Sequence, residues 1–464
     1  MGNILDKIKT VEDLEGNLRK KFSLKLNPFP KSGIANISDS DAVVGELVPT
    51  SNKIIEQIIR YMQDALSNSG QGAENKYLSL IIRGDYGMGK TQTLMFIKYL
   101  FGQLSTEKFK PYVIYIDNPG VKLSELIGNI LSQIGIENFR RYLWDIFRQY
   151  LEQEDKEKGN RPRKDIFLEI INAIKTANDT RNIQTSLHFD DDNTENQDKT
   201  RSLTWDQVSI SYKYLLDKML FGMRSPEQKD AVQLFKDYLV RCFAEKYEIS
   251  SIAEYFYDIV TDNTSVTKSW DQLITGNIKN IDKREVYLLR AIVEITKQYL
   301  GATDFIILAD EFEEIAIGRL KDADLDNYLR NLRSLIDKEK NWCAVFAMNG
   351  AAYKKIEKMS PPLASRMGDR IIDLKPLDES SCIAMIQHYL AIARVDQTTP
   401  LSLYPFDNSA IVSLLNTKEQ TLQGSPRFII QSCYLLLQRA AEELNEGQTI
   451  DQAFVMKYLS EKLK

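Results

Sequence analysis

Two parts of the chain alternate short runs of apolar and β-branched residues with amphipathic helical patterns. Such apolar runs are typical of buried strands. The runs lie at residues 77–83, 112–117, 304–309, 342–348 and 371–374. Helical spacing of apolar positions marks residues 54–66, 91–96, 123–134, 286–299 and 324–336. Because strands that alternate with helices form parallel sheets, the pattern predicts an α/β fold.

The alternation stops in the middle of the chain. Residues 135–282 contain no convincing buried strand, and we predict a helical insertion there. Helical patterns within it lie at residues 139–151, 164–177, 207–219, 227–247 and 252–259. Basic and aromatic residues mix at 140–164, as on a nucleic-acid or partner surface. Acidic residues at 152–155 instead favour a solvated helix face.

The two ends of the chain differ from this α/β pattern. Helical patterns at 379–393, 409–415, 426–444 and 451–463 predict an all-α domain at residues 377–464. Residues 1–46 are interpreted as an N-terminal extension with a short charged helix at 11–22. The α/β domain is therefore assigned to residues 47–134 and 283–376.

Composition narrows the class of protein. The 464 residues are 43% hydrophobic and 27% charged with a formal net charge of −5, as in a soluble globular protein without a whole-chain nucleic-acid signature. The four cysteines lack zinc-site spacing, and the two histidines are too few for a histidine metal site. Without an apolar run near 18 residues, we expect no membrane span and a cytoplasmic location.

A glycine-rich loop follows the first predicted strand and precedes a helix, in the form G-x-x-x-x-G-K-T. Its members are Gly84, Asp85, Tyr86, Gly87, Met88, Gly89, Lys90 and Thr91. The glycines allow a tight turn whose N–H groups, with the following helix N-terminus, make a phosphate cradle. Lys90 can reach the β- and γ-phosphates, and Thr91 can hold Mg²⁺. The flanking strand and helix leave a chance glycine turn as a weak alternative.

An acidic motif follows the predicted strand at 304–309. Asp310 and Glu311 stand at the carboxyl end of that strand, where open α/β sheets bind their ligands. Opposite a phosphate loop, Asp310 is suited to orient water on Mg²⁺. Glu311 is suited to polarise the attacking water as a general base. Glu313 and Glu314 are interpreted as the solvated start of a helix.

Two later residues are further candidates for the site. Asn349 follows the strand at 342–348, where it either hydrogen-bonds the attacking water or the γ-phosphate, or only forms a turn before Gly350. Pro426 is placed to open a helix, and Arg427 then projects from the first turn of that helix.

The ordered set of motifs resembles the AAA+ ATPases, nearest to the origin-recognition and replication-initiation ATPases and the transposition regulators. Residues 84–91 are similar to Walker A, Asp310 with Glu311 to Walker B, Asn349 to sensor 1, Ser365 with Arg366 to the arginine-finger box, and residues 424–427 to sensor 2. Walker motifs occur in many NTPases, whereas five elements in this order are far more specific. The resemblance covers residues 47–134 and 283–445.

The resemblance implies the P-loop NTPase sheet of an AAA+ core with a C-terminal helical lid. ATP and Mg²⁺ would bind between the α/β domain and the lid, with Arg427 contacting the γ-phosphate in cis. Arg366 would reach the γ-phosphate of a neighbouring subunit, which implies a ring or helical homo-oligomer. Arg370 is a rival for this role.

The implied function is ATP-dependent assembly and hydrolysis that remodels or loads a DNA-associated complex, in replication, transposition or phage defence. The alternative is a signalling switch or scaffold that recruits or activates an effector protein and hydrolyses ATP slowly. A metabolic kinase is a weaker alternative because no small-substrate pocket is evident. The long insertion departs from the family pattern and leaves DNA and protein partners open.

Overall fold

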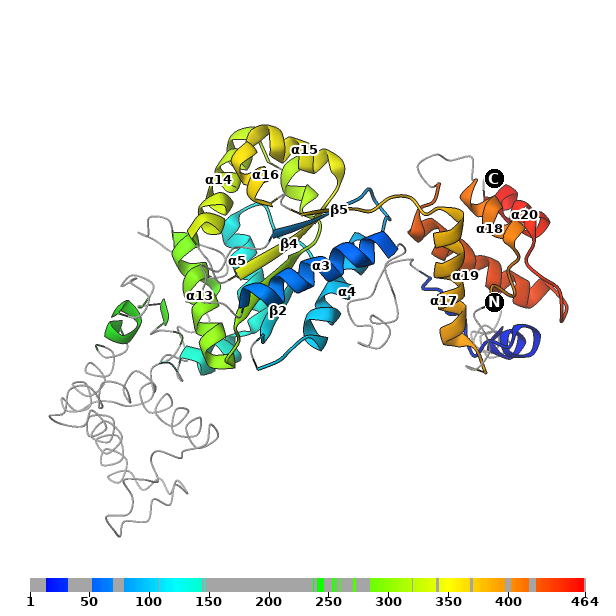
Figure 1. Cartoon of the computed structure of the whole chain (residues 1–464), viewed down its shortest axis with the longest axis horizontal. Helices are drawn as coiled ribbons and strands as arrows, with labels where there is room; N and C mark the ends of the chain where they lie inside the picture. The colour runs from blue at the N-terminus through cyan, green and yellow to red at the C-terminus, as the bar shows by residue number, and fades with distance from the viewer. Residues whose placement is uncertain are drawn as a thin grey trace, which may run out of the picture. The chain divides into compact units, whose positions relative to one another are not determined.

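The computed structural model describes the chain in segments (Figure 1). These are residues 14–31, 52–69, 79–107, 109–143, 146, 237, 240–245, 253, 255–256, 259, 270–272, 284–318, 320–338, 342–367, 370–396, 402–416 and 423–462. The chain divides into two compact units, one of Met1–Val121 with Thr303–Lys464 and one of Lys122–Ala302.

Five parallel strands form one sheet in the first unit. They are β1 (Ser79–Arg83), β2 (Pro111–Ile116), β3 (Asp304–Ala309), β4 (Trp342–Met348) and β5 (Ile371–Asp373), in the order β2-β3-β4-β1-β5. All five predicted strands are thus confirmed, as is the α/β P-loop NTPase sheet. Because β4 lies between β1 and β3, the segments that follow these three strands meet at one edge of the sheet.

One face of the sheet is covered by α3 (Asn52–Ser69) and α4 (Lys90–Gln103), which Figure 1 shows beside the strands. Alternate residues of the strands point to this face, as expected for a period of two. The shared core includes Ile58, Tyr61, Leu80, Ile82, Leu94, Ile97, Phe101, Ile306, Leu308, Val345 and Ala347. Full burial of one such large apolar side chain stabilises the fold by about 1.5–3 kcal/mol.

Aromatic packing fixes the segment that follows β3. The Phe312 ring lies 4.8 Å from that of Phe346 in β4 and 6.4 Å from that of Tyr328, both edge to face. Tyr328 belongs to α14 (Asp322–Lys338), and α15 (Gly350–Met359) and α16 (Pro361–Met367) follow β4. Phe312 therefore anchors the chain two residues after Asp310, which limits how far the acidic motif can move.

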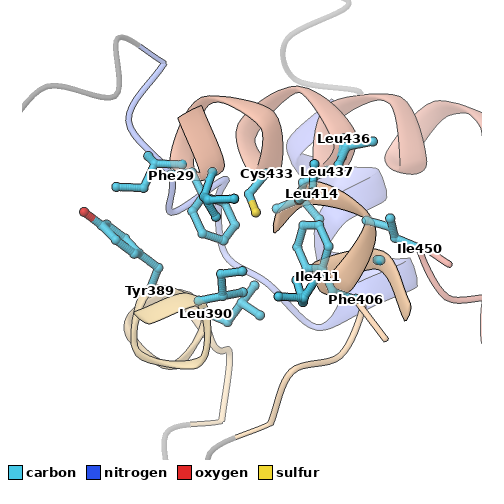
Figure 2. Packing of buried hydrophobic residues seen from close by; sticks show 14 of the residues in the cluster. Phe29, Tyr389, Leu390, Phe406, Ile411, Leu414, Cys433, Leu436, Leu437 and Ile450 are labelled. Carbon is cyan, nitrogen blue, oxygen red and sulfur yellow. The ribbon is translucent and has the colours of Figure 1, made fainter. Parts of the chain in front are cut away.

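Four helices form the C-terminal cluster, called the lid here: α17 (Glu379–Ala393), α18 (Asn408–Leu415), α19 (Pro426–Glu443) and α20 (Gln452–Lys462). They match the four predicted helices. Asp378 and Asp407 cap α17 and α18 by accepting hydrogen bonds from backbone N–H groups. Figure 2 shows side chains of α17, α18 and α19 converging on one apolar core.

The N-terminal segment is part of that core. Residues 14–22 are helical, and Leu18, Phe22, Leu24 and Phe29 are buried among lid residues. The Phe29 ring lies 5.4 Å from Tyr389 and 6.0 Å from Phe406, and Phe22 lies 6.0 Å from Tyr404. The segment interpreted from sequence as an extension thus contributes to the packing of the lid.

The second unit is helical where the structure describes it. It contains α5 (Leu123–Ile134) and α13 (Arg284–Leu300), which contact each other. Phe256 packs edge to face against both Phe139 and Phe243. The predicted helices at 164–177 and 207–219 lie outside the described residues, as do most of those at 139–151 and 227–247 and half of the one at 252–259. None of the described helices has the length and hydropathy needed to cross a membrane.

Candidate functional site

The glycine-rich loop connects β1 to α4 and has the backbone that its sequence predicts. Gly87 and Gly89 have φ angles of 80° and 88°, in the left-handed region that favours glycine. A Cβ atom at Gly84 would lie 3.0 Å from Cβ of Leu374, so a side chain at this position would crowd Leu374. Space is open where a Cβ of Gly89 would lie. The loop therefore fits a phosphate cradle at the start of α4.

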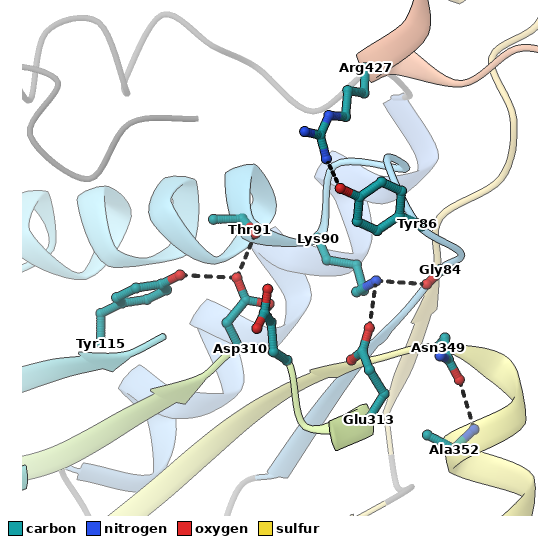
Figure 3. A network of polar contacts seen from close by, with 11 residues as sticks. Gly84, Tyr86, Lys90, Thr91, Tyr115, Asp310, Glu313, Asn349, Ala352 and Arg427 are labelled. Atoms are coloured by element: carbon teal, nitrogen blue, oxygen red, sulfur yellow. Dashed lines mark hydrogen bonds and ion pairs between the residues drawn. The ribbon is translucent and has the colours of Figure 1, made fainter. Parts of the chain in front are cut away.

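Lys90 begins α4 and is buried. Its Nζ atom donates to the carbonyl oxygen of Gly84 at 3.1 Å and lies 3.1 Å from Oε1 of Glu313 (Figure 3). The ammonium group is thus folded back along the loop towards the segment that follows β3.

Asp310 joins the phosphate loop to the end of β3. Its carboxylate is buried and accepts from Oγ1 of Thr91 at 2.5 Å and from the Tyr115 hydroxyl at 3.0 Å, both at Oδ2 (Figure 3). Its other oxygen accepts from the backbone N–H of Glu311 at 2.9 Å. Thr91 and Asp310, 219 positions apart, are therefore brought together as expected for one metal site.

Glu311 has an unusual backbone. Its φ angle of 48° lies in the left-handed region, which is uncommon for residues other than glycine. Loss of hydration raises the pKa of its carboxyl group, and the negative charges of Asp310 and other nearby acidic residues raise it further. A carboxylate of raised pKa is a better proton acceptor, and strained residues are found at functional sites. Both features suit a general base.

The structure corrects the interpretation of Glu313, which was predicted to be solvated. Its side chain is 22% exposed and forms the ion pair with Lys90 described above. Glu314 has a different partner from Glu313, because its Oε2 atom accepts a hydrogen bond from Nδ2 of Asn118 at 3.1 Å. These residues lead into a π-helical turn, Glu314–Gly318, a rare geometry that is frequent near functional sites.

Asn349 lies at the tip of β4, between the two motifs in the order of the sheet. It is the N-cap of α15, and its Oδ1 atom accepts from the backbone N–H of Ala352 at 2.8 Å (Figure 3). The cap uses the side-chain oxygen, so the amide nitrogen is the atom that can donate to a ligand. The turn-forming role and the predicted phosphate-facing role are thus compatible.

Arg427 contacts the tip of the phosphate loop from the first turn of α19. Its backbone N–H donates to the Gly87 carbonyl at 3.2 Å. Its guanidinium group donates to the Tyr86 hydroxyl and lies 4.8 Å from the centre of that ring (Figure 3). A Cβ atom on Gly87 would approach Oγ of Ser425 to 2.9 Å. Gly87 is therefore needed for both the turn and this close approach.

The two arginines considered for action on a neighbouring subunit differ in their contacts. Arg370 pairs with Asp64 of α3 at 2.6 Å. Arg366 lies in the last turn of α16, is partly exposed, and donates to the Pro362 carbonyl of its own helix at 3.1 Å. The Arg370 side chain is therefore held by an ion pair within its own chain.

Sequence reasoning did not identify Tyr115 or the pairing of Glu313. Tyr115 lies in β2 and is largely buried, and its hydroxyl group needs a partner there. The available signal was a tyrosine between Ile114 and Ile116, which are both buried. For Glu313, spacing gave no signal, because a glutamate before a helix is normally solvated.

The donor set fits Mg²⁺. This ion takes oxygen ligands and is usually held by one or two protein groups, with water and substrate phosphates completing its shell. Oγ1 of Thr91 and Oδ2 of Asp310 are two adjacent oxygen atoms of this kind. Among the described residues, no group of three or more His, Cys, Asp or Glu side chains is arranged to hold a metal ion.

No protein-family model and no curated protein matches the chain. Three of the similar solved structures are archaeal. The Aeropyrum pernix ORC2 protein in its ADPNP–ADP complexes is 12% identical with a TM-score of 0.42, covering 88% of this chain and 67% of that one. The ADP form of the same protein is also 12% identical with a TM-score of 0.42, covering 89% of this chain and 69% of that one. Cdc6p from Pyrobaculum aerophilum gives 11% and 0.38, covering 88% and 68%.

At such identities and TM-scores the likeness carries no argument about a residue or an activity. The fold class therefore rests on the parallel sheet and its phosphate loop.

Proposed function

We propose that this protein binds ATP with Mg²⁺ and hydrolyses it. The observation that carries the proposal is the meeting of two distant motifs at one edge of the sheet. Oγ1 of Thr91 lies 2.5 Å from Oδ2 of Asp310. Nζ of Lys90, the residue before Thr91, lies 3.1 Å from Oε1 of Glu313 in the segment that follows β3. Thr91 and Asp310 would hold the Mg²⁺ ion, which would supply positive charge to offset the negative charge that develops during phosphoryl transfer.

Each residue then has one task. The loop N–H groups and Lys90 bind the phosphates, and Thr91 with Asp310 holds the metal ion. Glu311 accepts a proton from the attacking water, and the Asn349 amide group orients that water or the γ-phosphate. Arg427 approaches the loop from α19, where its charge can stabilise the transferring phosphoryl group.

The test separates binding from hydrolysis. Lys90→Ala is expected to abolish tight ATP binding, as measured by isothermal calorimetry. Glu311→Gln is expected to bind ATP normally and to lose turnover by about 10²–10⁴-fold, the usual contribution of a general base. Unchanged ATP affinity in Lys90→Ala would remove the central assignment. Normal turnover in Glu311→Gln would assign the base to another residue.

We further propose that ATP at subunit interfaces assembles the chain into a ring or helical homo-oligomer that remodels or loads a DNA-associated complex. The resemblance of five ordered motifs to the origin-recognition group supports this proposal. ATPase turnover and particle size, each measured with and without double-stranded DNA, test it. Turnover that rises with DNA is expected.

One result would instead favour the signalling switch. If ATP drives assembly while DNA leaves turnover unchanged, the assembled state itself is the output, and an effector protein is the partner to seek. Slow hydrolysis would then only reset the assembly.

A further inference from the structure

We propose that Glu313 is a positioning residue for Lys90, and that its carboxylate competes with nucleotide phosphates for the lysine ammonium group. The inference rests on the proposed function, because it takes a polyphosphate as the ligand of the loop. Its basis is the 3.1 Å separation between Oε1 of Glu313 and Nζ of Lys90. Glu313 thereby holds the ammonium group at the loop and lowers the affinity of the loop for nucleotide.

The ion pair is sheltered from water. The Lys90 and Glu313 side chains are only 10% and 22% exposed, and Nζ also donates to the Gly84 carbonyl at 3.1 Å. Charges interact more strongly in such surroundings than in bulk water. A phosphate that binds Lys90 must therefore displace the Glu313 carboxylate or accept its repulsion at close range.

The second carboxylate oxygen of Glu313 indicates why a phosphate can replace Glu313 as the partner of Lys90. Oε2 is buried and has no hydrogen-bond partner within the part of the chain that the structure describes. A carboxylate that loses its water without gaining bonds at both oxygens is less stable than a fully bonded one. Glu313 therefore holds Lys90 without the full set of contacts expected of a permanent structural ion pair.

The neighbouring acidic residue supplies a matched control. Glu314 carries the same charge one position later, but its Oε2 atom accepts a hydrogen bond from Asn118, not from Lys90, at 3.1 Å. A general effect of removing negative charge near the loop would appear in both variants. An effect through Lys90 would appear only at Glu313.

The experiment compares Glu313→Gln, Glu313→Ala and Glu314→Gln with the wild type. Calorimetry measures the affinities for ATP, ADP and AMP, and steady-state assays give KM and kcat for ATP. We expect both Glu313 variants to bind ATP and ADP about tenfold more tightly, since removal of a sheltered charge competitor frees one strong ion contact. AMP lacks the phosphates that Lys90 reaches, so its affinity should stay unchanged. KM should fall with little change in kcat, whereas Glu314→Gln should resemble the wild type.

Three results would overturn the inference. They are equal or weaker ATP affinity in both Glu313 variants, an equal gain in Glu314→Gln, or a collapse of kcat at constant affinity, which would make Glu313 the base. In each of them the wild type still binds ATP, so the proposed function survives. Failure of every protein to bind any nucleotide would overturn the proposed function and this inference together.

Discussion

At the residue scale, the Asp310 carboxylate accepts hydrogen bonds from three different parts of the chain. Thr91 at the start of α4 and Tyr115 in β2 both donate to Oδ2, and the backbone N–H of Glu311 donates to Oδ1. Burial and the charge of Asp310 raise the pKa of Tyr115 above its usual range, so its hydroxyl group remains a proton donor. Tyr115 therefore helps to hold the carboxylate that we propose as part of the metal site.

Removal of that hydroxyl group should weaken the metal site selectively. In Tyr115→Phe, the Mg²⁺ concentration that gives half-maximal ATP binding should rise by about three- to tenfold, as loss of one net hydrogen bond of about 1 kcal/mol implies. ATP affinity measured in EDTA should not change. A titration of MgCl₂ against ATP binding measures the shift.

Tyr112 provides the control for that experiment. It lies in the same strand, and its ring packs against Phe305 with the ring centres 5.7 Å apart. Tyr112→Phe should leave the Mg²⁺ requirement as in the wild type. Equal shifts in both variants would mean that the effect comes from the packing of β2 rather than from the bond to Asp310.

Sequence alone predicted those site residues whose motif is local. Lys90 and Thr91 follow from the spacing of the glycine-rich loop, and Asp310 and Glu311 follow from their place at a strand end. Tyr115 and Glu313 did not follow, because their partners lie 195 and 223 positions away along the chain. Only the pairing of the strands decides which side chains become neighbours across such separations.

At the element scale, the same contrast separates the sheet from the N-terminal segment. The five strands were predicted from apolar runs because a strand buried on both faces carries that signature in its own residues. The segment at residues 14–31 carries no comparable signal. Its place is set by long-range bonds such as those from Lys25 N–H to Ala393 and from Val395 N–H to Ser23, at 2.7 and 3.0 Å.

A buried arginine strengthens this attachment. Arg394 follows α17, and its Nη1 atom donates to the Phe22 carbonyl at 3.0 Å, while Nη2 donates to the carbonyl of Tyr404. The Tyr404 hydroxyl group donates in turn to the Lys21 carbonyl at 2.9 Å. Satisfying a buried guanidinium group with these carbonyls makes the N-terminal segment part of the lid fold.

Loss of the Phe22 side chain should therefore loosen helices that follow it by more than 350 positions. Phe22→Ala is expected to destabilise the lid by about 3–5 kcal/mol, the usual cost of deleting a buried aromatic ring. Hydrogen exchange measured by mass spectrometry should speed up in α17 and α19. Lys20→Ala, at an exposed position of the same helix, should leave exchange unchanged. Unchanged exchange in both variants would place the segment outside the cooperative unit of the lid.

At the scale of the whole molecule, the chain enters the lid first, then the sheet, and returns to the lid at its end. Residues 14–31 and α17 to α20 share one core, and residues 374–378 lead from β5 into α17. The apolar pattern along the chain predicted the four helices of the lid, but it could not show that residues 14–31 pack against them. This packing depends on contacts between segments that lie far apart in the sequence.

The last prediction concerns contact between copies of the chain. If Arg366 acts on the site of a neighbouring subunit, Arg366→Ala should bind ATP yet lose turnover by about 10³–10⁵-fold. Lys90→Ala should also be inactive, because it cannot bind ATP, although it keeps Arg366. A mixture of the two variants should recover measurable turnover, since each Lys90→Ala subunit supplies the arginine that the ATP-bound neighbour lacks. Recovery with Arg370→Ala in place of Arg366→Ala would identify Arg370 as the acting residue. No recovery with either variant would mean that neither arginine acts across the interface.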